Sequence, residues 1–318
     1  MKTPSYKLLV PAFFILFTSN LYAKTALVTE NPATATKKVA EDVPVKKIIW
    51  TGCGITKKAF MAEIAKAYEK KYGVTIELKG GGATNGIRKT KAGESHLGGT
   101  CRLPLHNRAE ESQLLKLILV AWDALVVIVH KDAPIDDIKQ QELIDVLEGK
   151  IAYWNELSGW KGKSDDMVKI DIFTRGSKIS GVGYTLRKIL FNDTDKVFSS
   201  TKEFPSSGPL EKGIEKNINS FGVTGISSAR KRNVKVLNLN GIKPDYETIK
   251  TGNYVMYRPL YLTYSSIYRL PKNEKKEVRR FLEFIKSDEA AKIIKANGVV
   301  PFKDGFHLVR KRKDIFGN

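Results

Sequence analysis

A cysteine stands between two glycines in the stretch TGCGITKKAF, residues 51–60, where the apolar run KKIIW gives way to a pattern typical of a helix. Glycine lets the backbone come close to a ligand, and the first turn of a helix offers unpaired N–H groups with a partial positive charge. A thiol at such a turn can form a disulfide, take part in redox chemistry or bind a metal. The chain has one other cysteine, Cys101, which follows the run HLGGT.

Three glycine-bearing turns precede patterns typical of helices, namely GCGIT, GGGATNG and RGSKISGVG. Each turn carries a hydroxyl side chain that can donate to an anion, and these are Thr56, Thr84 and Ser180. Arg175 adds a planar fork of donors that suits a tetrahedral oxyanion. Together these residues predict an anion-binding site. Each turn alone is also typical of an ordinary loop, and Arg175 is also typical of a salt bridge at a strand end.

The sequence has no motif for a metal or a nucleotide cofactor. HExxH, CxxC and GxxxxGKS/T are absent, and GGGATNG lacks the GxGxxG spacing of a dinucleotide loop. His96 and His106 lie near Cys101 in the sequence, but no ligand spacing selects them. We therefore expect neither a cofactor nor a metal.

Alternating strand and helix patterns position the first two turns. The strand patterns are KKIIWTG, VTIELK and HLGGTC, and the helix patterns between them span residues 56–73 and 83–93. In the first helix, Phe60, Ile64 and Tyr68 recur on one face. This βαβαβ order predicts a parallel sheet whose carboxyl edge receives the helix N-termini and the ligand. Residues 168–191 repeat the order strand, glycine loop and helix, so we expect two sheets facing a common cleft.

The amino-terminal residues 1–23 are typical of an export signal. Lys2 and Lys7 lie in this segment, the apolar run is LLVPAFFILF, and small Ala23 marks the expected cleavage position. The apolar run has roughly half the length that a membrane-spanning helix needs. Residues 24–44 are rich in Ala, Thr, Pro and charged residues, which predicts a flexible leader. We therefore expect the mature protein outside the cytoplasm.

The chain is strongly basic, with a formal charge of +20 over 318 residues, and loss of the two signal lysines leaves +18. Excess Lys and Arg is typical of nucleic-acid binding. However, the basic residues are spread along amphipathic helix patterns such as NEKKEVRRFLEFIKS, and only RKRKD near the end is a dense cluster. We therefore expect no nucleic-acid partner and interpret the charge as a basic surface that steers anions or contacts an anionic membrane.

Four blocks of the sequence resemble successive blocks of the periplasmic phosphate-binding proteins of ABC transporters. They are KKIIWTGCGIT, IELKGGGATNGIRKTKAGESHLGGTCRLPL, LVAWDALVVIVHKDAPIDDIKQQELIDVLEGKIAYWNEL and GIKPDYETIKTGNYVMYRPLYL. The resemblance covers residues 46–301 and implies an α/β fold of the two-lobed class II periplasmic binding protein type, with a ligand cleft between the lobes. Lobe one would comprise residues 45–127 and 258–318, and lobe two residues 128–257. The runs VVIV and YRPLYL would be crossover strands between the lobes.

The resemblance also implies a set of ligand-binding positions. In this sequence they are Thr56, Thr84, Cys101, Arg175, Ser180 and Gly181. Two departures stand out near the third turn: Arg175 precedes Ser180 by five residues where the family often has four, and Val182 stands where threonine is usual. The third departure is Cys101 itself, because relatives carry a carboxylate or a serine after LGGT.

Cys53 and Cys101 each follow a strand pattern, and the first and third strands of a βαβαβ unit are expected to be neighbours. In an oxidising compartment two such thiols predict a disulfide. It would close a loop of about 49 residues, which the chain-entropy model values at roughly 4 kcal/mol. Two free or redox-active thiols, or a metal site, are the other interpretations.

The favoured hypothesis is a non-catalytic, monomeric binding protein of the periplasm that takes inorganic phosphate or a related oxyanion and delivers it to an ABC permease in the inner membrane. A carboxylate at the position of Cys101 would accept a hydrogen bond from a protonated ligand, whereas a thiol in a disulfide would not. We therefore expect weaker discrimination between phosphate and sulfate than in relatives with the carboxylate. The alternatives are a redox or sensory protein that uses Cys53 and Cys101 as a switch, and a basic adhesion or nucleic-acid-binding protein.

Overall fold

The computed structural model describes residues 44–111, 115–165, 167–265 and 270–312, and these belong to one compact unit. The predicted export signal lies outside the described residues, as does the predicted leader except for Pro44. Among the described residues, no helix is both long enough and apolar enough to cross a membrane.

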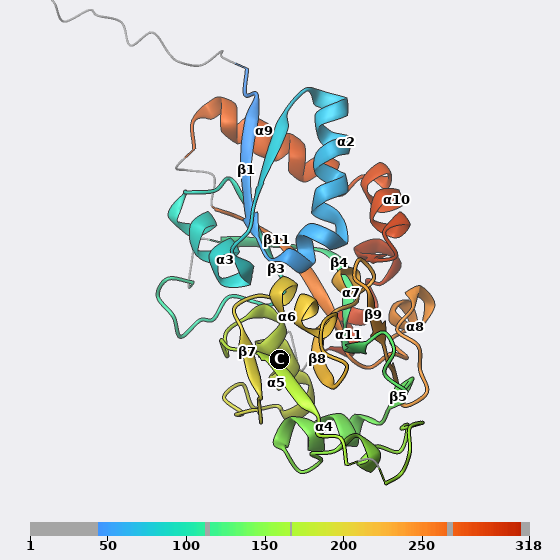
Figure 1. The fold of residues 1–318 in the computed structure, drawn as a ribbon. Helices are drawn as coiled ribbons and strands as arrows, with labels where there is room; N and C mark the ends of the chain where they lie inside the picture. Colours follow the sequence, from blue (N-terminus) through green and yellow to red (C-terminus); the bar gives the residue numbers. More distant parts are fainter. Residues whose placement is uncertain (1–43, 112–114, 166, 266–269, 313–318) are drawn as a thin grey trace, which may run out of the picture. The chain divides into compact units, whose positions relative to one another are not determined.

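Three parallel strands form one end of a 10-stranded sheet (Figure 1). Strand β1 lies between the other two, and the bounds are β1 (Lys47–Gly52), β2 (Thr75–Lys79) and β3 (Leu97–Thr100). Trp50 of β1 is opposite Leu78 of β2 and Leu97 of β3. This pairing confirms the predicted parallel arrangement, including the prediction that the first and third strands are neighbours.

The 16-residue strand β4 (Leu115–His130) joins the two ends of the sheet. Its residues 115–124 pair antiparallel with β11 (Tyr257–Ser265), and its residues 125–129 pair antiparallel with β8 (Ser220–Gly225). Residues 120–129 of β4 are all buried. A strand buried on both faces needs a nearly continuous apolar sequence, which the run LVAWDALVVIV supplies.

Beyond β4 the sheet continues through β8, β6 (Asp171–Arg175) and β7 (Lys202–Phe204), and β6 is parallel to both of its neighbours. Two short strands also pair with β4, namely β9 (Val234–Val236) and β12 (Val300–Pro301), while β5 (Asp137–Ile138) and β10 (Asn238–Leu239) form a separate two-stranded sheet. We call β1, β2, β3 and β11 with their helices the first half, and β6, β7 and β8 with their helices the second half. Because β4 runs through the predicted lobe boundary at residues 127 and 128, the boundaries themselves stay a prediction.

A continuous helical segment follows β1, although it is not the single regular helix that the sequence predicts. It consists of α1 (Gly54–Thr56), the π-helical turn η2 (Lys57–Met61) and α2 (Ala62–Tyr72). The predicted apolar face is confirmed, because Phe60, Ile64 and Tyr68 are all fully buried. The π turn arises where the amide of Ala62 donates to the carbonyl of Lys57, and such turns are frequent at functional sites.

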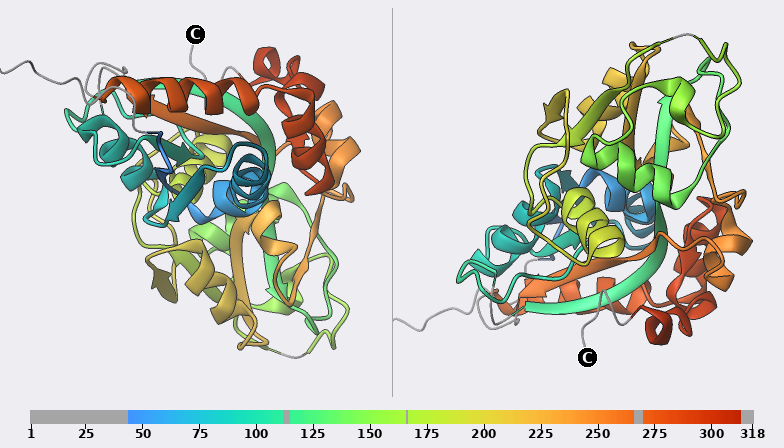
Figure 2. Two further views of the ribbon diagram at one scale, coloured as in Figure 1. Left: turned by 90° about the horizontal axis from the view of Figure 1, so that it is seen from above. Right: turned by 90° about the horizontal axis from the view of Figure 1, so that it is seen from below.

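The remaining helices cover both halves of the sheet. Tyr68 of α2 packs against Phe281 of α9 (Lys272–Phe284), with ring centroids 5.1 Å apart. Helix α3 (Gly82–Ala92) contacts α5 (Gly181–Phe191) from the opposite half, and the two helices can be followed in Figure 2. The helix predicted at residues 184–191 begins three residues earlier, at Gly181.

The other helices of the described residues are α4 (Gln140–Glu148), η3 (Trp154–Glu156), α6 (Ser207–Ile214), α7 (Ile226–Ala229), α8 (Tyr246–Thr251), α10 (Asp288–Ala296), η5 (Phe302–Asp304) and α11 (Leu308–Lys311).

The glycine at position 98 lets α3 pack closely on β3. A Cβ atom at Gly98 would lie 2.3 Å from the carbonyl oxygen of Gly86 and equally close to the hydroxyls of Thr90 and Thr263. These neighbours belong to α3 and β11, so the contact joins three elements of the first half.

We expect Gly98→Ala to lower the free energy of unfolding by about 1–3 kcal/mol, because the added methyl group overpacks this contact. Gly80→Ala is the matched control, since a Cβ atom there meets nothing within 4 Å. Urea unfolding of both variants is the measurement, and equal midpoints for the two would contradict the close packing at β3.

Candidate anion-binding site

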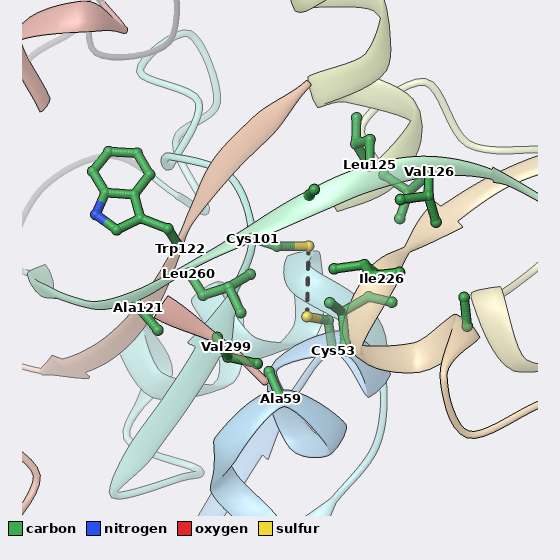
Figure 3. Close-up of a cluster of buried hydrophobic side chains, with 14 of the residues drawn as sticks. Cys53, Ala59, Cys101, Ala121, Trp122, Leu125, Val126, Ile226, Leu260 and Val299 are labelled. Atoms are coloured by element: carbon green, nitrogen blue, oxygen red, sulfur yellow. Dashed lines mark hydrogen bonds between the residues drawn. The ribbon is translucent and has the colours of Figure 1, made fainter. Parts of the chain in front are cut away.

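The carboxyl ends of β1 and β3 place Cys53 and Cys101 side by side (Figure 3). Each cysteine directly follows its strand, and the amide of Cys53 donates to the carbonyl of Gly99 at 3.1 Å. The two sulfur atoms are 3.5 Å apart, and the side chains are buried. Both cysteines are free in the structure, so the disulfide stays a prediction, while the predicted proximity is confirmed.

Thr56 contacts Cys53 through both its backbone amide and its hydroxyl. The backbone amide of Thr56 donates to Cys53 Sγ at 3.3 Å, and its hydroxyl oxygen lies 3.2 Å from the same sulfur. The single proton of that hydroxyl is donated to the carbonyl of Cys53 at 2.9 Å. Cys53 therefore caps the helical segment, and its sulfur and carbonyl occupy the amide and the hydroxyl that the sequence assigns to an anion.

Ser180 and Gly181 begin α5 in the second half and meet the cysteines from the other side. The hydroxyl of Ser180 accepts from the amide of Gly183 at 3.1 Å, which makes Ser180 the N-cap of this helix. A Cβ atom on Gly181 would lie only 2.3 Å from Cys101 Sγ, so the sulfur packs directly over the glycine backbone. Thr185 strengthens this contact by donating to the carbonyl of Cys101 at 3.2 Å.

Thr84 contacts the buried ion pair of Arg102 and Glu111, which sequence reasoning missed. Arg102 donates to the hydroxyl of Thr84 at 3.2 Å, forms two hydrogen bonds with Glu111 at 2.6 and 2.8 Å, and donates to the carbonyl of Ile179 at 2.7 Å. Ile179 belongs to the loop before α5, so Arg102 links the two halves. Burial raises the pKa of Glu111, but the hydrogen bonds and charge of Arg102 outweigh it and lower that pKa overall.

Arg175 is bound mainly to its own half of the molecule. Its guanidinium donates to the carbonyls of Phe204 at 3.3 Å and Pro205 at 2.7 Å, and to the hydroxyl of Ser207 at 3.2 Å. Burial lowers its pKa, while the charges of Cys101 and Cys53 act in the opposite direction. Arg175 therefore lies within the electrostatic reach of the thiols without a direct hydrogen bond to them.

Arg258 is the functional candidate that sequence reasoning missed. It is fully buried in β11, opposite Asp123 of β4, with the guanidinium 3.4 Å from the Asp123 carboxylate and 3.4 Å from the carbonyl of Gly181. Its Nε donates to no group among the described residues. A single Asp in the run LVAWDALVVIV and a single Arg in YRPLYL were the available signal, because one charge in each of two buried strands indicates a buried pair.

The charges around Arg258 compensate one another. Burial lowers the pKa of Arg258, but the charges of Cys101, Asp123 and Cys53 outweigh it and raise that pKa. Burial raises the pKa of Asp123 more than the charge of Arg258 lowers it. The cluster therefore pairs a permanent cation with acidic groups whose charge depends on pH.

A second polar link between the halves involves Lys58 of the π turn and Glu211 of α6. Lys58 donates to the Glu211 carboxylate at 3.1 Å and to the hydroxyl of Ser228 at 2.7 Å. The fully buried carboxylate of Glu211 also accepts from Thr224 at 2.6 Å and from Arg232 at 3.0 Å. This link lies beside the candidate site, since Lys58 is two residues beyond Thr56.

The two thiols differ in acidity. Burial raises the pKa of Cys53, but hydrogen bonds to Cys101 and Thr56 and the charge of Arg258 outweigh it and lower the pKa to about 6. The hydrogen bond to Cys53 and burial raise the pKa of Cys101 well above its ordinary value. Cys53 is therefore the more acidic thiol of the pair and the first to become a thiolate as the pH rises. Among the described residues, no cluster of three or more His, Cys, Asp or Glu side chains could hold a metal ion.

We expect the reduced protein to become more stable as the pH rises from about 6 to about 9. The folded-state pKa of Cys53 is about 6 and its ordinary value is 9.0, so the unfolded chain holds more protons in this window. Stability then rises with pH by at most about 1.4 kcal/mol per unit, and the gain is lost as the pH falls through the folded-state pKa. Urea unfolding under a reducing agent should show this slope, and Cys53→Ala should lack it. Equal slopes in the two proteins would contradict the thiolate assignment.

Comparison with known proteins agrees with this architecture. The family model described as PBP superfamily domain matches residues 38–289. The chain is 25% identical over 256 residues to the phosphate-binding protein PstS of Bacillus subtilis, and the match covers 80% of each chain. A substrate-binding protein from Clostridium perfringens, solved with bound phosphate, superposes with a TM-score of 0.68 at 23% identity and covers 80% of this chain and 99% of its own.

An ABC-type phosphate transport receptor from Vibrio cholerae has the same architecture, with a TM-score of 0.59 at 22% identity, and covers 80% of this chain and 99% of its own. These structural matches confirm the predicted two-lobed α/β fold, and the family is one of solute-binding proteins rather than enzymes. The chain therefore belongs to the PBP superfamily, as the resemblance in its sequence predicts.

Proposed function

We propose that this protein binds a tetrahedral oxyanion, inorganic phosphate above all, where its two halves meet. The observation that carries the proposal is the fully buried guanidinium of Arg258, which lies beside Gly181 and the thiols, with an Nε that has no partner among the described residues. Thr56 adds an amide and a hydroxyl, and we place Thr84 and Arg175 in the same proposed site. The names of the phosphate-binding relatives support phosphate as the ligand.

We further propose that the mature protein works in the periplasm as a monomer without catalytic activity and delivers its ligand to an ABC permease. The names of the relatives as phosphate-binding and phosphate-transport proteins support this role. In the proposed lobe division, residues 45–127 and 258–318 supply Thr56, Thr84 and Arg258, while residues 128–257 supply Arg175, Ser180 and Gly181. A site made by both lobes would hold them together once the ligand is bound.

Oxyanions should stabilise the ligand-free protein against heat. A ligand that binds only the folded state raises its stability by about 2.7 kcal/mol at one hundred times the dissociation constant. We expect phosphate to raise the melting temperature of refolded, ligand-free protein, and sulfate to raise it by a comparable amount because Cys101 offers no carboxylate that would reject sulfate. Chloride at the same ionic strength is the control. No shift with phosphate, arsenate, sulfate, molybdate or tungstate, in the reduced protein and in the oxidised protein alike, would contradict the proposed function.

Replacement of Arg175 should weaken anion binding without unfolding the protein. The guanidinium retains N–H groups beyond those bound to Phe204, Pro205 and Ser207, and a donor lost from a desolvated oxyanion typically costs about 1.5–3 kcal/mol. We therefore expect Arg175→Ala to raise the dissociation constant for phosphate by about ten-fold or more.

Arg279→Ala is the matched control, because this arginine lies on the exposed face of α9 and its loss changes the net charge equally. Calorimetric titration of both variants measures the effect. Unchanged affinity in Arg175→Ala, or an equal loss in both variants, would remove Arg175 from the site.

A further inference from the structure

The sulfur of Cys53 competes for donors that the proposed anion site needs. It accepts from the amide of Thr56 at 3.3 Å and lies 3.2 Å from the Thr56 hydroxyl. An oxyanion bound by Thr56 would require these same two groups. The sulfur therefore has to release or share the amide, and the carbonyl of Cys53 the hydroxyl, before an anion can bind there.

The sulfur of Cys101 occupies the opposite side of the same site. It packs against Gly181, where even a methyl group would come within 2.3 Å of it. The carbonyl of Gly181 in turn accepts from Arg258 at 3.4 Å. The sulfur pair thus lies between the donors of Thr56 in the first half and the start of α5 in the second.

Groups of the protein itself also compensate the charge of Arg258, which a bound anion would need. A thiolate at Cys53 and the carboxylate of Asp123 both compensate this buried guanidinium, whose carboxylate contact is 3.4 Å. A bound oxyanion would add negative charge beside the thiolate, and like charges repel strongly in a buried site. A neutral sulfur pair would remove this repulsion and leave the guanidinium to the anion.

The geometry allows that neutral state. The sulfur atoms are 3.5 Å apart and follow neighbouring parallel strands, whereas a disulfide requires a separation of about 2.05 Å. The two sulfur atoms therefore need to move only a short distance toward each other. Side-chain rotation of the two cysteines, which directly follow their strands, can supply this movement.

We propose that Cys53 and Cys101 form a thiol–disulfide switch that controls oxyanion binding, with the reduced pair excluding the anion and the disulfide admitting it. The inference rests on the proposed function and adds a regulation of the same site. The oxidant belongs to the class of small or protein disulfides. The Cys53 thiolate attacks a sulfur of the oxidant and forms a mixed disulfide, then Cys101 gives up its proton and displaces the second thiol. Two electrons pass to the oxidant, which leaves as two thiols.

The test uses the mature chain in two defined states, refolded from denaturant either with a reducing agent or with oxidised glutathione. Thiol alkylation followed by mass spectrometry establishes the state of each sample. Calorimetric titration with phosphate, and separately with sulfate, should show about ten-fold or greater tightening in the oxidised protein at pH 8, where the Cys53 thiolate is formed.

Two single variants separate the switch from a merely structural disulfide, because neither can form the bond. Cys53→Ala removes the thiolate that holds Thr56, so it should bind like the oxidised protein under both conditions. Cys101→Ala keeps the Cys53 sulfur on the backbone amide of Thr56, so it should bind like the reduced protein under both conditions. A structural disulfide would affect the two variants alike. Circular dichroism and melting temperature report whether each variant is folded.

The outcomes are distinct. Tightening on oxidation together with divergent single variants supports the switch. Equal affinity in the two redox states, equal behaviour of the two variants, or failure of oxidised glutathione to form the disulfide overturns it while leaving the proposed function intact. Absence of oxyanion binding in every state and in Cys53→Ala overturns the proposed function and the switch together.

Discussion

The buried guanidinium of Arg258 is the charge on which the arrangement at the centre of the molecule depends. An arginine cannot discard its charge at any ordinary pH, so its removal from water must be compensated by the groups around it. Asp123 faces it across the pairing of β4 and β11, and the carbonyl of Gly181 and the two thiols lie close by. The direct contacts are long, at 3.4 Å, so the surrounding charges rather than short hydrogen bonds stabilise the guanidinium. A buried cation without short hydrogen bonds suits the binding of an anion.

The polar contacts between the halves can be broken without leaving a fully buried charge unpaired. When Lys58 withdraws, Glu211 still accepts from Thr224 and Arg232, which belong to the second half. When the carbonyl of Ile179 moves away, Arg102 keeps both of its hydrogen bonds to Glu111 within the first half. Arg258 likewise keeps Asp123. Since the penalty for parting buried charges comes mainly from an abandoned partner, such links permit the halves to separate at moderate cost.

Local patterns in the sequence predicted the helices and strands. The contacts that these patterns did not predict depend on pairing between strands far apart in the sequence. The parallel order of β1, β2 and β3 follows from alternation of strand and helix, and it places Cys53 beside Cys101. The π turn at Lys57–Met61 was not predicted, because its hydrogen bonds shift by one residue without a change in the apolar face. Arg258 and Asp123 were missed because only the register of β11 on β4 puts them opposite each other. The sequence shows that each of these charges is isolated in an apolar run, but it does not show that the two are partners.

Cys101 stands where the resemblance in the sequence implies a carboxylate or a serine. A carboxylate there would carry a negative charge at any neutral pH, fixing the balance between the site and its ligand. A thiol carries its charge conditionally, because the charge disappears on protonation or on formation of a disulfide. The more acidic of the two thiols is the neighbouring Cys53: burial raises its pKa, and hydrogen bonds to Cys101 and Thr56 with the charge of Arg258 lower it to about 6. Two thiols thus replace a fixed charge with one that depends on pH and redox state, beside a guanidinium whose charge does not change.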